Sequence, residues 1–126
     1  MPLPAHARIQ AAQSFVRDVR SAHDFLQEQD AISATGRYAA LLARLKEARE
    51  HLAWNPSAGR PARFLQARSA QGQAAAQRAI LLAAQHGLPN LRELVVKPYV
   101  LLYAHSENSV VLLALKHERQ LLFRLP

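Results

Sequence analysis

Three apolar segments separated by turn residues dominate the last third of the chain, between Leu91 and His117. Proline lacks the amide proton that a strand ladder needs, so Lys97-Pro98 divides the first segment from the second. Turn-forming Ser and Asn in residues 105–108 divide the second from the third. The pattern predicts three strands, over residues 91–97, 98–104 and 109–116. The short second turn predicts an antiparallel hairpin, and the scarcity of polar residues predicts cover on at least one face of the sheet.

Nearer the N-terminus the apolar positions recur at helical spacing. Ser14 is expected to cap a first helix that ends near Gln29-Asp30, and a second helix is expected to begin after Ser33 or Thr35. The apolar stripes are Phe15, Val19, Ala22, Phe25 and Leu26 in the first helix, and Tyr38, Leu41, Leu42, Leu45, Ala48 and Leu52 in the second. Two amphipathic helices with a short polar link predict an αα-hairpin whose apolar face covers the strands.

The other segments carry weaker signals. Residues 1–8 contain two prolines and are expected to be a loose lead-in, and residues 9–15 allow a short first strand. Turn residues over 54–63 predict a loop. The Ala- and Gln-rich segment 64–86 allows a further helix of roughly four turns, ended by Gly87. The C-terminal tail is expected either to extend the third strand or to begin a partner-facing segment.

This order of elements indicates the α+β class: an N-terminal helical hairpin packed on a C-terminal antiparallel β-meander, with an extra helix between them. The chain of 126 residues suits a single domain over residues 1–126.

Composition limits the partners. The chain has no cysteine, no apolar run near the ~20 residues that span a bilayer, and no apolar signal-peptide core, which favours a cytosolic protein. Its net charge of +7 favours an acidic partner: nucleic acid, an acidic protein or a membrane surface. The middle of the chain is the most basic region, because no Asp or Glu occurs between His51 and Arg92.

Motifs for several chemistries are absent from the sequence. The four glycines form neither a GxGxxG nor a GxxxxGK[ST] phosphate loop, and there is no GxSxG or HExxH motif. The six histidines are scattered, so no metal site and no cofactor are expected.

Basic and aromatic residues on or beside the predicted sheet are the remaining candidates: Arg92, Lys97, Tyr99, Tyr103, His105, Lys116, His117 and Arg119. Such a surface could bind RNA phosphates, or cleave RNA with His or Lys as acid and base and Arg stabilising the charged transition state. The alternative is that the tyrosines are core or rim aromatics and the cations are solvated residues that protect the sheet edge.

The motifs NPSAGRP (55–61), LRELVV (91–96), PYVLLY (98–103) and HERQ (117–120), in this order, resemble the RelE/ParE family of toxins from bacterial type II toxin–antitoxin systems. The resemblance covers residues from about 15 to 120 and implies a helical hairpin on a twisted antiparallel sheet. In the family the turn runs almost directly into the LREL strand, whereas here the segment 62–90 intervenes. We interpret that segment as an inserted helix.

The resemblance also separates two activities. The RelE-like branch cuts messenger RNA on the ribosome, and a basic residue typically follows the first aromatic of its YxLxY strand. Here that position holds Val100, and Glu118 stands where a further cation would help RNA cleavage. The ending His117-Glu118-Arg119-Gln120 is more similar to the ParE-like branch, which is associated with inhibition of DNA gyrase.

Three functions follow as hypotheses. The first is a ParE-like gyrase inhibitor, neutralised by a cognate antitoxin with an acidic toxin-binding segment. Its expected partner- or nucleic-acid-binding residues are Arg60, Arg92, Lys97, Tyr99, Tyr103, Lys116, His117 and Arg119. The second is a RelE-like mRNA interferase, with Arg92, Lys116, His117 and Arg119 as its catalytic candidates. The third is a non-toxic module that binds a partner or nucleic acid.

Overall fold

The computed structural model describes residues 6–126. A five-stranded sheet lies at its centre, in the order β1-β5-β4-β3-β2. The strands span Arg8–Ala11 (β1), Arg60–Pro61 (β2), Asn90–Val96 (β3), Tyr99–His105 (β4) and Ser109–His117 (β5). All neighbours pair antiparallel except β1, which lies parallel to β5. The three predicted strands of the meander are therefore confirmed to within about one residue.

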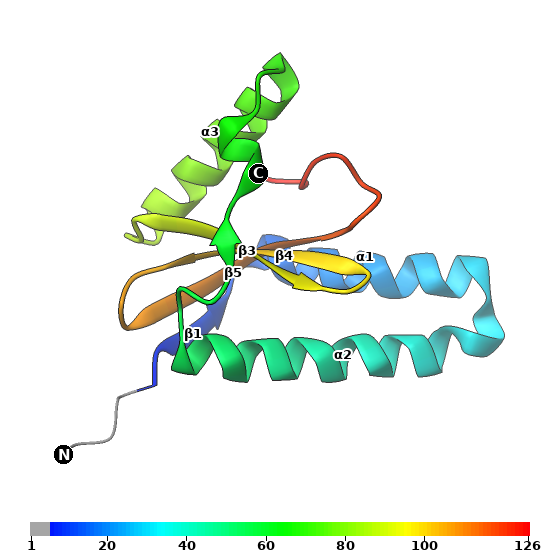
Figure 1. Cartoon of the computed structure of the whole chain (residues 1–126). Coiled ribbons are helices and arrows are strands. Elements are labelled where there is room, and N and C mark those ends of the chain that lie inside the picture. Colours follow the sequence, from blue (N-terminus) through cyan, green and yellow to red (C-terminus); the bar gives the residue numbers. More distant parts are fainter. Residues whose placement is uncertain (1–5) are drawn as a thin grey trace.

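The helical hairpin covers one face of this sheet (Figure 1). It consists of α1 (Gln13–Gln29) and α2 (Ala31–Trp54), and its far half projects beyond the strands. On this face a single apolar cluster joins Phe15 of α1 and Leu52 of α2 to Leu101 and Tyr103 of β4. The predicted α2 stripe lies on the sheet side except Leu42, which is 42% exposed. The fold class and the role of the hairpin as cover are confirmed.

A second layer covers the opposite face. It contains the short 3₁₀ helix η1 (Arg63–Gln66), α3 (Ala70–Gln85) and the C-terminal tail. Leu82 of α3 and Phe123 of the tail pack with Leu102 of β4 and Leu113 of β5 in a separate apolar cluster. Every residue of β4 is buried, because both faces of the sheet are covered. The sequence predicted cover on at least one face.

Two helix boundaries differ from the sequence predictions, and a third helix agrees with them. Ser14 does not cap α1: the helix begins one residue earlier, and the Ser14 hydroxyl donates to the Leu113 carbonyl of β5. The second helix begins at Ala31, because the Asp30 side chain caps it by accepting from the Ile32 amide. The helix of roughly four turns predicted within 64–86 is present as α3, which begins at Ala70 because the Ser69 side chain caps it by accepting from the Gly72 amide; the separate 3₁₀ helix η1 precedes it.

The predictions for the first strand, the N-terminal lead-in, the loop and Gly87 agree with the structure to different extents. The first strand is present, but ends at Ala11 because α1 begins at Gln13. The lead-in predicted over residues 1–8 falls partly outside the described residues, and Arg8 already belongs to β1. The loop predicted over 54–63 contains β2, which pairs with β3. Gly87 ends α3 as predicted, with φ of 70°, a backbone conformation that glycine adopts without a side-chain clash.

The tail does not extend β5. It turns away after His117, where the Glu118 amide donates to the Pro98 carbonyl and the Gln120 amide donates to the His117 carbonyl. The chain then folds back over the α3 side, and Phe123 becomes 7% exposed. Within residues 6–126, no helix is long and apolar enough to cross a membrane.

Candidate functional site

The sequence-predicted site residues lie in three separate places. Strand register explains the separation: Arg92 pairs with Tyr103 near one end of β4, whereas His117 pairs with Tyr99 at the other end. Four residues of strand put these ends roughly 13 Å apart. Side chains also alternate between faces, so Lys116 points to the α3 side and His117 to the α1 side.

The first place is a clamp on the NPSAGRP loop. The Tyr103 hydroxyl accepts from the Gly59 amide at 2.9 Å and donates to the Pro56 carbonyl at 2.7 Å. Arg92 Nη1 donates to the Gly59 carbonyl at 2.8 Å, and its Nε donates to His105 Nε2 at 3.0 Å. Burial raises the pKa of the fully buried Tyr103. Arg92 and Tyr103 thus hold the loop in place. For Tyr103 this is a structural role, the alternative to binding that the sequence analysis gave for the tyrosines.

The His105 ring belongs to the same clamp. Its Nε2 accepts from Arg92, so the ring proton must lie on Nδ1, which then donates to the Ser106 carbonyl at 3.0 Å. This tautomer uses both ring nitrogens in fixed hydrogen bonds.

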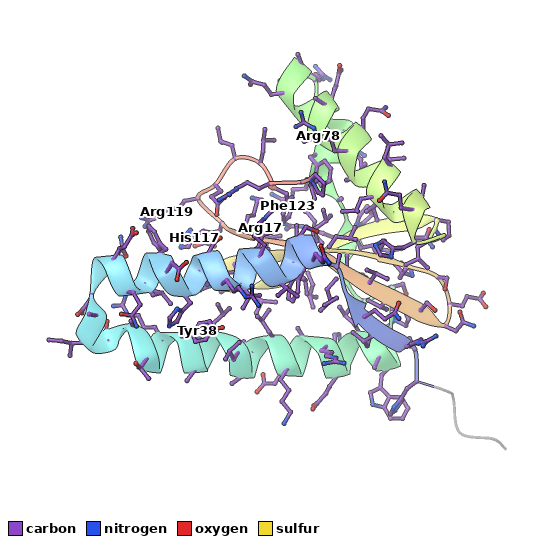
Figure 2. All side chains as sticks on the ribbon, turned by 180° about the vertical axis from the view of Figure 1, so that it is seen from behind. Arg17, Tyr38, Arg78, His117, Arg119 and Phe123 are labelled. Carbon is purple, nitrogen blue, oxygen red and sulfur yellow. The ribbon has the colours of Figure 1, made fainter. Side chains whose placement is uncertain are left out.

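The second place is the α1-side cleft, which lies between α1, the end of β5 and the tail. Tyr99, His117 and Arg119 line it together with Asp18 and Arg124. The His117 ring packs edge-on against Tyr99, with centroids 5.5 Å apart, and His117 Nδ1 accepts from the Arg119 amide at 3.1 Å. Figure 2 shows His117 and Arg119 beside α1, well away from Arg78 on α3. Burial raises the pKa of the Tyr99 hydroxyl, so this group stays neutral near pH 7.

Asp18 is the charged group that the sequence analysis missed in this cleft. It is 6% exposed, and its carboxylate accepts from the Leu115 amide of β5 at 2.9 Å. Burial raises its pKa, while the Leu115 hydrogen bond and the charge of Arg17 act in the opposite direction. Its signal in the sequence was a polar residue three positions after Phe15, on the face that packs against the sheet.

Asp18 gives a pH-dependent prediction. Because its pKa in the folded protein lies above the ordinary value of 3.8, folding favours the protonated form. Stability supported by Asp18 is therefore full below pH 3.8 and is lost as the pH rises through the folded-state pKa. Asp18→Asn keeps an acceptor for Leu115 but does not titrate. We expect the wild type to lose stability relative to this variant between about pH 3.5 and pH 7.

Chemical denaturation of both proteins at the two pH values measures this difference. The control is Glu28→Gln, the corresponding carboxylate-to-amide change at an exposed position of the same helix. A gain in relative wild-type stability with rising pH would contradict the prediction.

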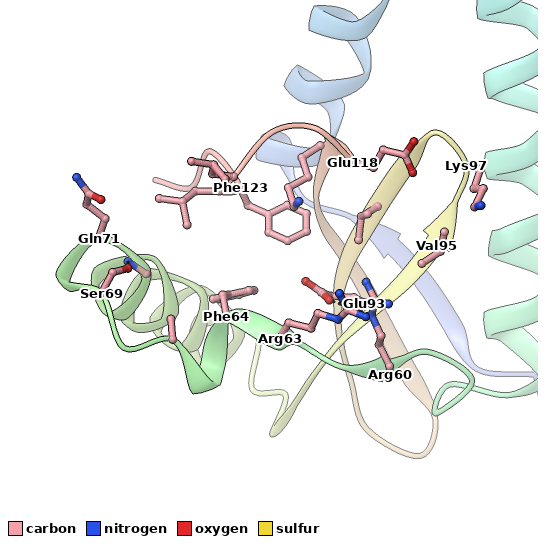
Figure 3. Close-up of a pocket in the computed structure, with 16 residues that line it drawn as sticks. Arg60, Arg63, Phe64, Ser69, Gln71, Glu93, Val95, Lys97, Glu118 and Phe123 are labelled. Carbon is pink, nitrogen blue, oxygen red and sulfur yellow. Dashed lines mark hydrogen bonds and ion pairs between the residues drawn. The ribbon is translucent and has the colours of Figure 1, made fainter.

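The third place is a groove between the sheet, η1, the start of α3 and the tail, which we call the α3-side groove (Figure 3). It has a volume of about 630 Å³. Of the predicted residues, Arg60, Lys97 and Lys116 line it. Arg60 Nε donates to the Glu93 carboxylate at 3.2 Å, and Glu93 is 4% exposed.

Lys116 is a partly buried cation of this groove. Its ammonium donates to the Gln120 carbonyl at 2.9 Å and lies 5.3 Å from the centre of the Phe123 ring. Burial lowers its pKa; Glu93 opposes this effect, while Arg60 and Arg63 reinforce it. Val100 stands where the RelE-like branch typically has a basic residue. It lines the same groove and pairs with Lys116 across β4 and β5.

The structure thus brings Tyr99, His117 and Arg119 together, and separately Arg60, Lys97 and Lys116. It does not bring the four nuclease candidates Arg92, Lys116, His117 and Arg119 into one site. Arg63 and Phe123 of the α3-side groove were missed, because their positions depend on how the inserted segment and the tail fold. Among the described residues, no group of three or more His, Cys, Asp or Glu side chains could hold a metal ion.

Fold and grooves define a small basic α+β protein of the RelE/ParE-like type, with a helical hairpin on an antiparallel sheet. The model of the family described as ParE toxin of the type II toxin–antitoxin system parDE matches residues 9–122. The chain belongs to this family of toxins, and membership implies a cognate antitoxin partner. No curated protein sequence matches the chain.

Proposed function

We propose that this toxin acts as a binding protein that inhibits DNA gyrase, not as a nuclease. The observation that carries the proposal is the split of the candidate catalytic residues. RNA cleavage needs an acid, a base and a phosphate-binding cation within reach of one scissile bond. Here Arg92 is engaged in the loop clamp, Lys116 faces the α3 side, and His117 and Arg119 face the α1 side.

The α1-side cleft is the surface we assign to the target. His117 is the last residue of β5, and Arg119 follows it in the tail; both line the cleft, and Arg119 is exposed. Exposed Phe25 adds an apolar contact at the same cleft, with 51% of its surface accessible. An aromatic beside cations is a composition typical of binding hot spots.

A supercoiling assay with purified gyrase tests the proposal. We expect wild-type protein in excess to stop supercoiling. The double variant His117→Ala, Arg119→Ala should need about tenfold more protein for the same inhibition, a loss of ~1.4 kcal/mol. Arg78→Ala, which removes an exposed cation on α3, is the matched control and should inhibit like the wild type. Full supercoiling at excess wild-type protein would overturn the proposal.

One observation favours a second function, the mRNA interferase. Lys116 has a lowered pKa and lies near Arg60 and Arg63, as an acid/base group beside phosphate-binding cations would. Cleavage of ribosome-bound mRNA that is lost in Lys116→Ala would favour this function over gyrase inhibition. Growth arrest on expression without antitoxin would in turn exclude the non-toxic binding module.

A further inference from the structure

The α3-side groove combines an apolar surface with a positively charged rim. Phosphate binding alone would require only the charge. The floor and walls of the groove are apolar, formed by Val95 and Val100 of the sheet, Phe64 of η1 and Phe123 of the tail. The Phe64 and Phe123 rings have centroids 5.8 Å apart and pack against each other, so together they form one wall of the groove (Figure 3). Leu121 stands on the rim and is 93% exposed. Apolar surface of this kind, beside a hollow, indicates a binding site for an apolar face.

Positive charge surrounds this apolar floor. The lining cations are Arg60, Arg63, Lys97 and Lys116, against the two carboxylates of Glu93 and Glu118. Glu93 is already neutralised by its ion pair with Arg60. In the described part of the chain, Arg63 and Lys97 form no ion pair with a carboxylate. The groove therefore presents a net positive rim that a ligand's acidic groups would neutralise.

The start of α3 adds to this potential. Ser69, Gln71 and Gly72 line the groove at the N-terminus of a 16-residue helix, which carries no acidic residue in its first turn. The partial positive charge of this helix end is left without an internal anion. Cations, helix end and apolar floor thus converge on one surface.

We propose that the α3-side groove binds an acidic amphipathic segment of the antitoxin, with the apolar face of the segment on the exposed side chains of Val95, Leu121 and Leu122 and its carboxylates at Arg63 and Lys97. Such a segment satisfies both chemistries of the groove at once. A nucleic acid satisfies only the charge: its phosphates would meet Glu118 and leave the apolar floor unused. The inference rests on the toxin function, because it assumes an antitoxin that neutralises this chain.

The inserted segment 62–90 then has a definite role. η1 and the start of α3 build one wall of the groove, so this insertion selects the antitoxin that the toxin accepts. The target surface at His117 and Arg119 lies on the other face of the sheet, so partner selection and target binding use different residues.

Binding of a defined peptide tests the proposal. The probe is a fluorescent helical peptide of about 15 residues, roughly 22 Å long, with leucines along one face and glutamates elsewhere. A scrambled peptide of identical composition controls for attraction by charge alone. In fluorescence anisotropy at about 0.15 M salt, we expect the amphipathic peptide to bind the full chain at least tenfold more tightly than the scrambled one.

Two pairs of variants locate the binding. Arg63→Glu should weaken binding about tenfold, whereas Arg78→Glu, which changes the net charge equally but lies outside the groove, should change it less than about twofold. Leu121→Ala should weaken binding about fivefold, whereas Leu81→Ala, an exposed leucine on α3, should not. All four side chains are exposed, so unchanged thermal unfolding is expected to confirm the fold.

Three outcomes would overturn the proposal. One is equal loss with Arg63→Glu and Arg78→Glu, another is equal binding of the scrambled peptide, and the third is a DNA or RNA duplex that binds at Arg63 more tightly than the peptide. Measuring gyrase inhibition by Arg63→Glu separates the test of the antitoxin groove from the test of the proposed gyrase inhibition. Loss of peptide binding with intact inhibition supports a separate antitoxin groove, and failure of inhibition by the wild type affects only the proposed function.

Discussion

Gly59→Ala should destabilise the protein by about 3 kcal/mol, lowering its melting temperature by roughly 12 °C. A Cβ atom at this position would lie 2.5 Å from the Glu93 carbonyl oxygen and 2.8 Å from the Tyr103 hydroxyl. The Glu93 oxygen belongs to the backbone of a paired strand and cannot move without disturbing the sheet. The loop must therefore give way, and its hydrogen bonds to Tyr103 and Arg92 are lost with it.

Gly36→Ala is the matched control. A Cβ at Gly36 meets no atom within 4 Å, and the residue lies inside α2, where alanine is favoured over glycine by roughly 0.5–1 kcal/mol. The same substitution should therefore have opposite signs at the two sites. Tyr103→Phe removes the hydroxyl but not the Glu93 carbonyl, so adding Gly59→Ala to Tyr103→Phe should still lower stability relative to the Tyr103→Phe single variant. Equal stability of the double and the single variant would contradict the proposed backbone clash.

Leu101→Ala and Leu102→Ala should each cost about 2–5 kcal/mol in the free energy of unfolding. Both side chains have 0% exposure and they are neighbours on β4, but they point to opposite faces. Leu101 packs in the cluster under the helical hairpin, and Leu102 packs under α3 and the tail. Equal costs would mean that the second layer is as much a core as the first.

Urea denaturation measures both variants, with Leu81→Ala as a control for the same side chain at an exposed position, where the loss should stay below about 0.5 kcal/mol. A loss below about 1 kcal/mol for Leu102→Ala would show that α3 and the tail cover the sheet only loosely.

The sequence predicted the elements well where one signal acted alone. The strands of the meander were found because proline and turn residues mark their ends, and Gly87 was placed because glycine adopts the positive φ that commonly follows a helix. Ser14 was misassigned because a hydroxyl that suits a helix cap also suits a hydrogen bond to a neighbouring strand, here to Leu113. Local sequence does not say which partner a hydroxyl will find.

The candidate site was harder to predict, because it depends on register. Sequence spacing alone gives no sign that Arg92 and His117 lie at opposite ends of β4, or that a bulge between Leu102 and Tyr103 shifts the pairing with β5. Arg63 and Phe123 escaped notice because the inserted helix is only weakly amphipathic and the tail resembles a strand extension. Their meeting at Lys116 is a product of the tertiary fold.

The parallel pairing of β1 with β5 has a consequence for when the toxin can fold during its synthesis. The Ser14 hydroxyl donates to the Leu113 carbonyl, 99 residues further along the chain. The Asp18 carboxylate accepts from the Leu115 amide, 97 residues further along. The hairpin, although made first, has no sheet to pack against until β5 leaves the ribosome. Such non-local contacts make folding slow and late. Because β5 contributes residues to both the α1-side cleft and the α3-side groove, a chain whose β5 is still to be synthesised has neither surface complete.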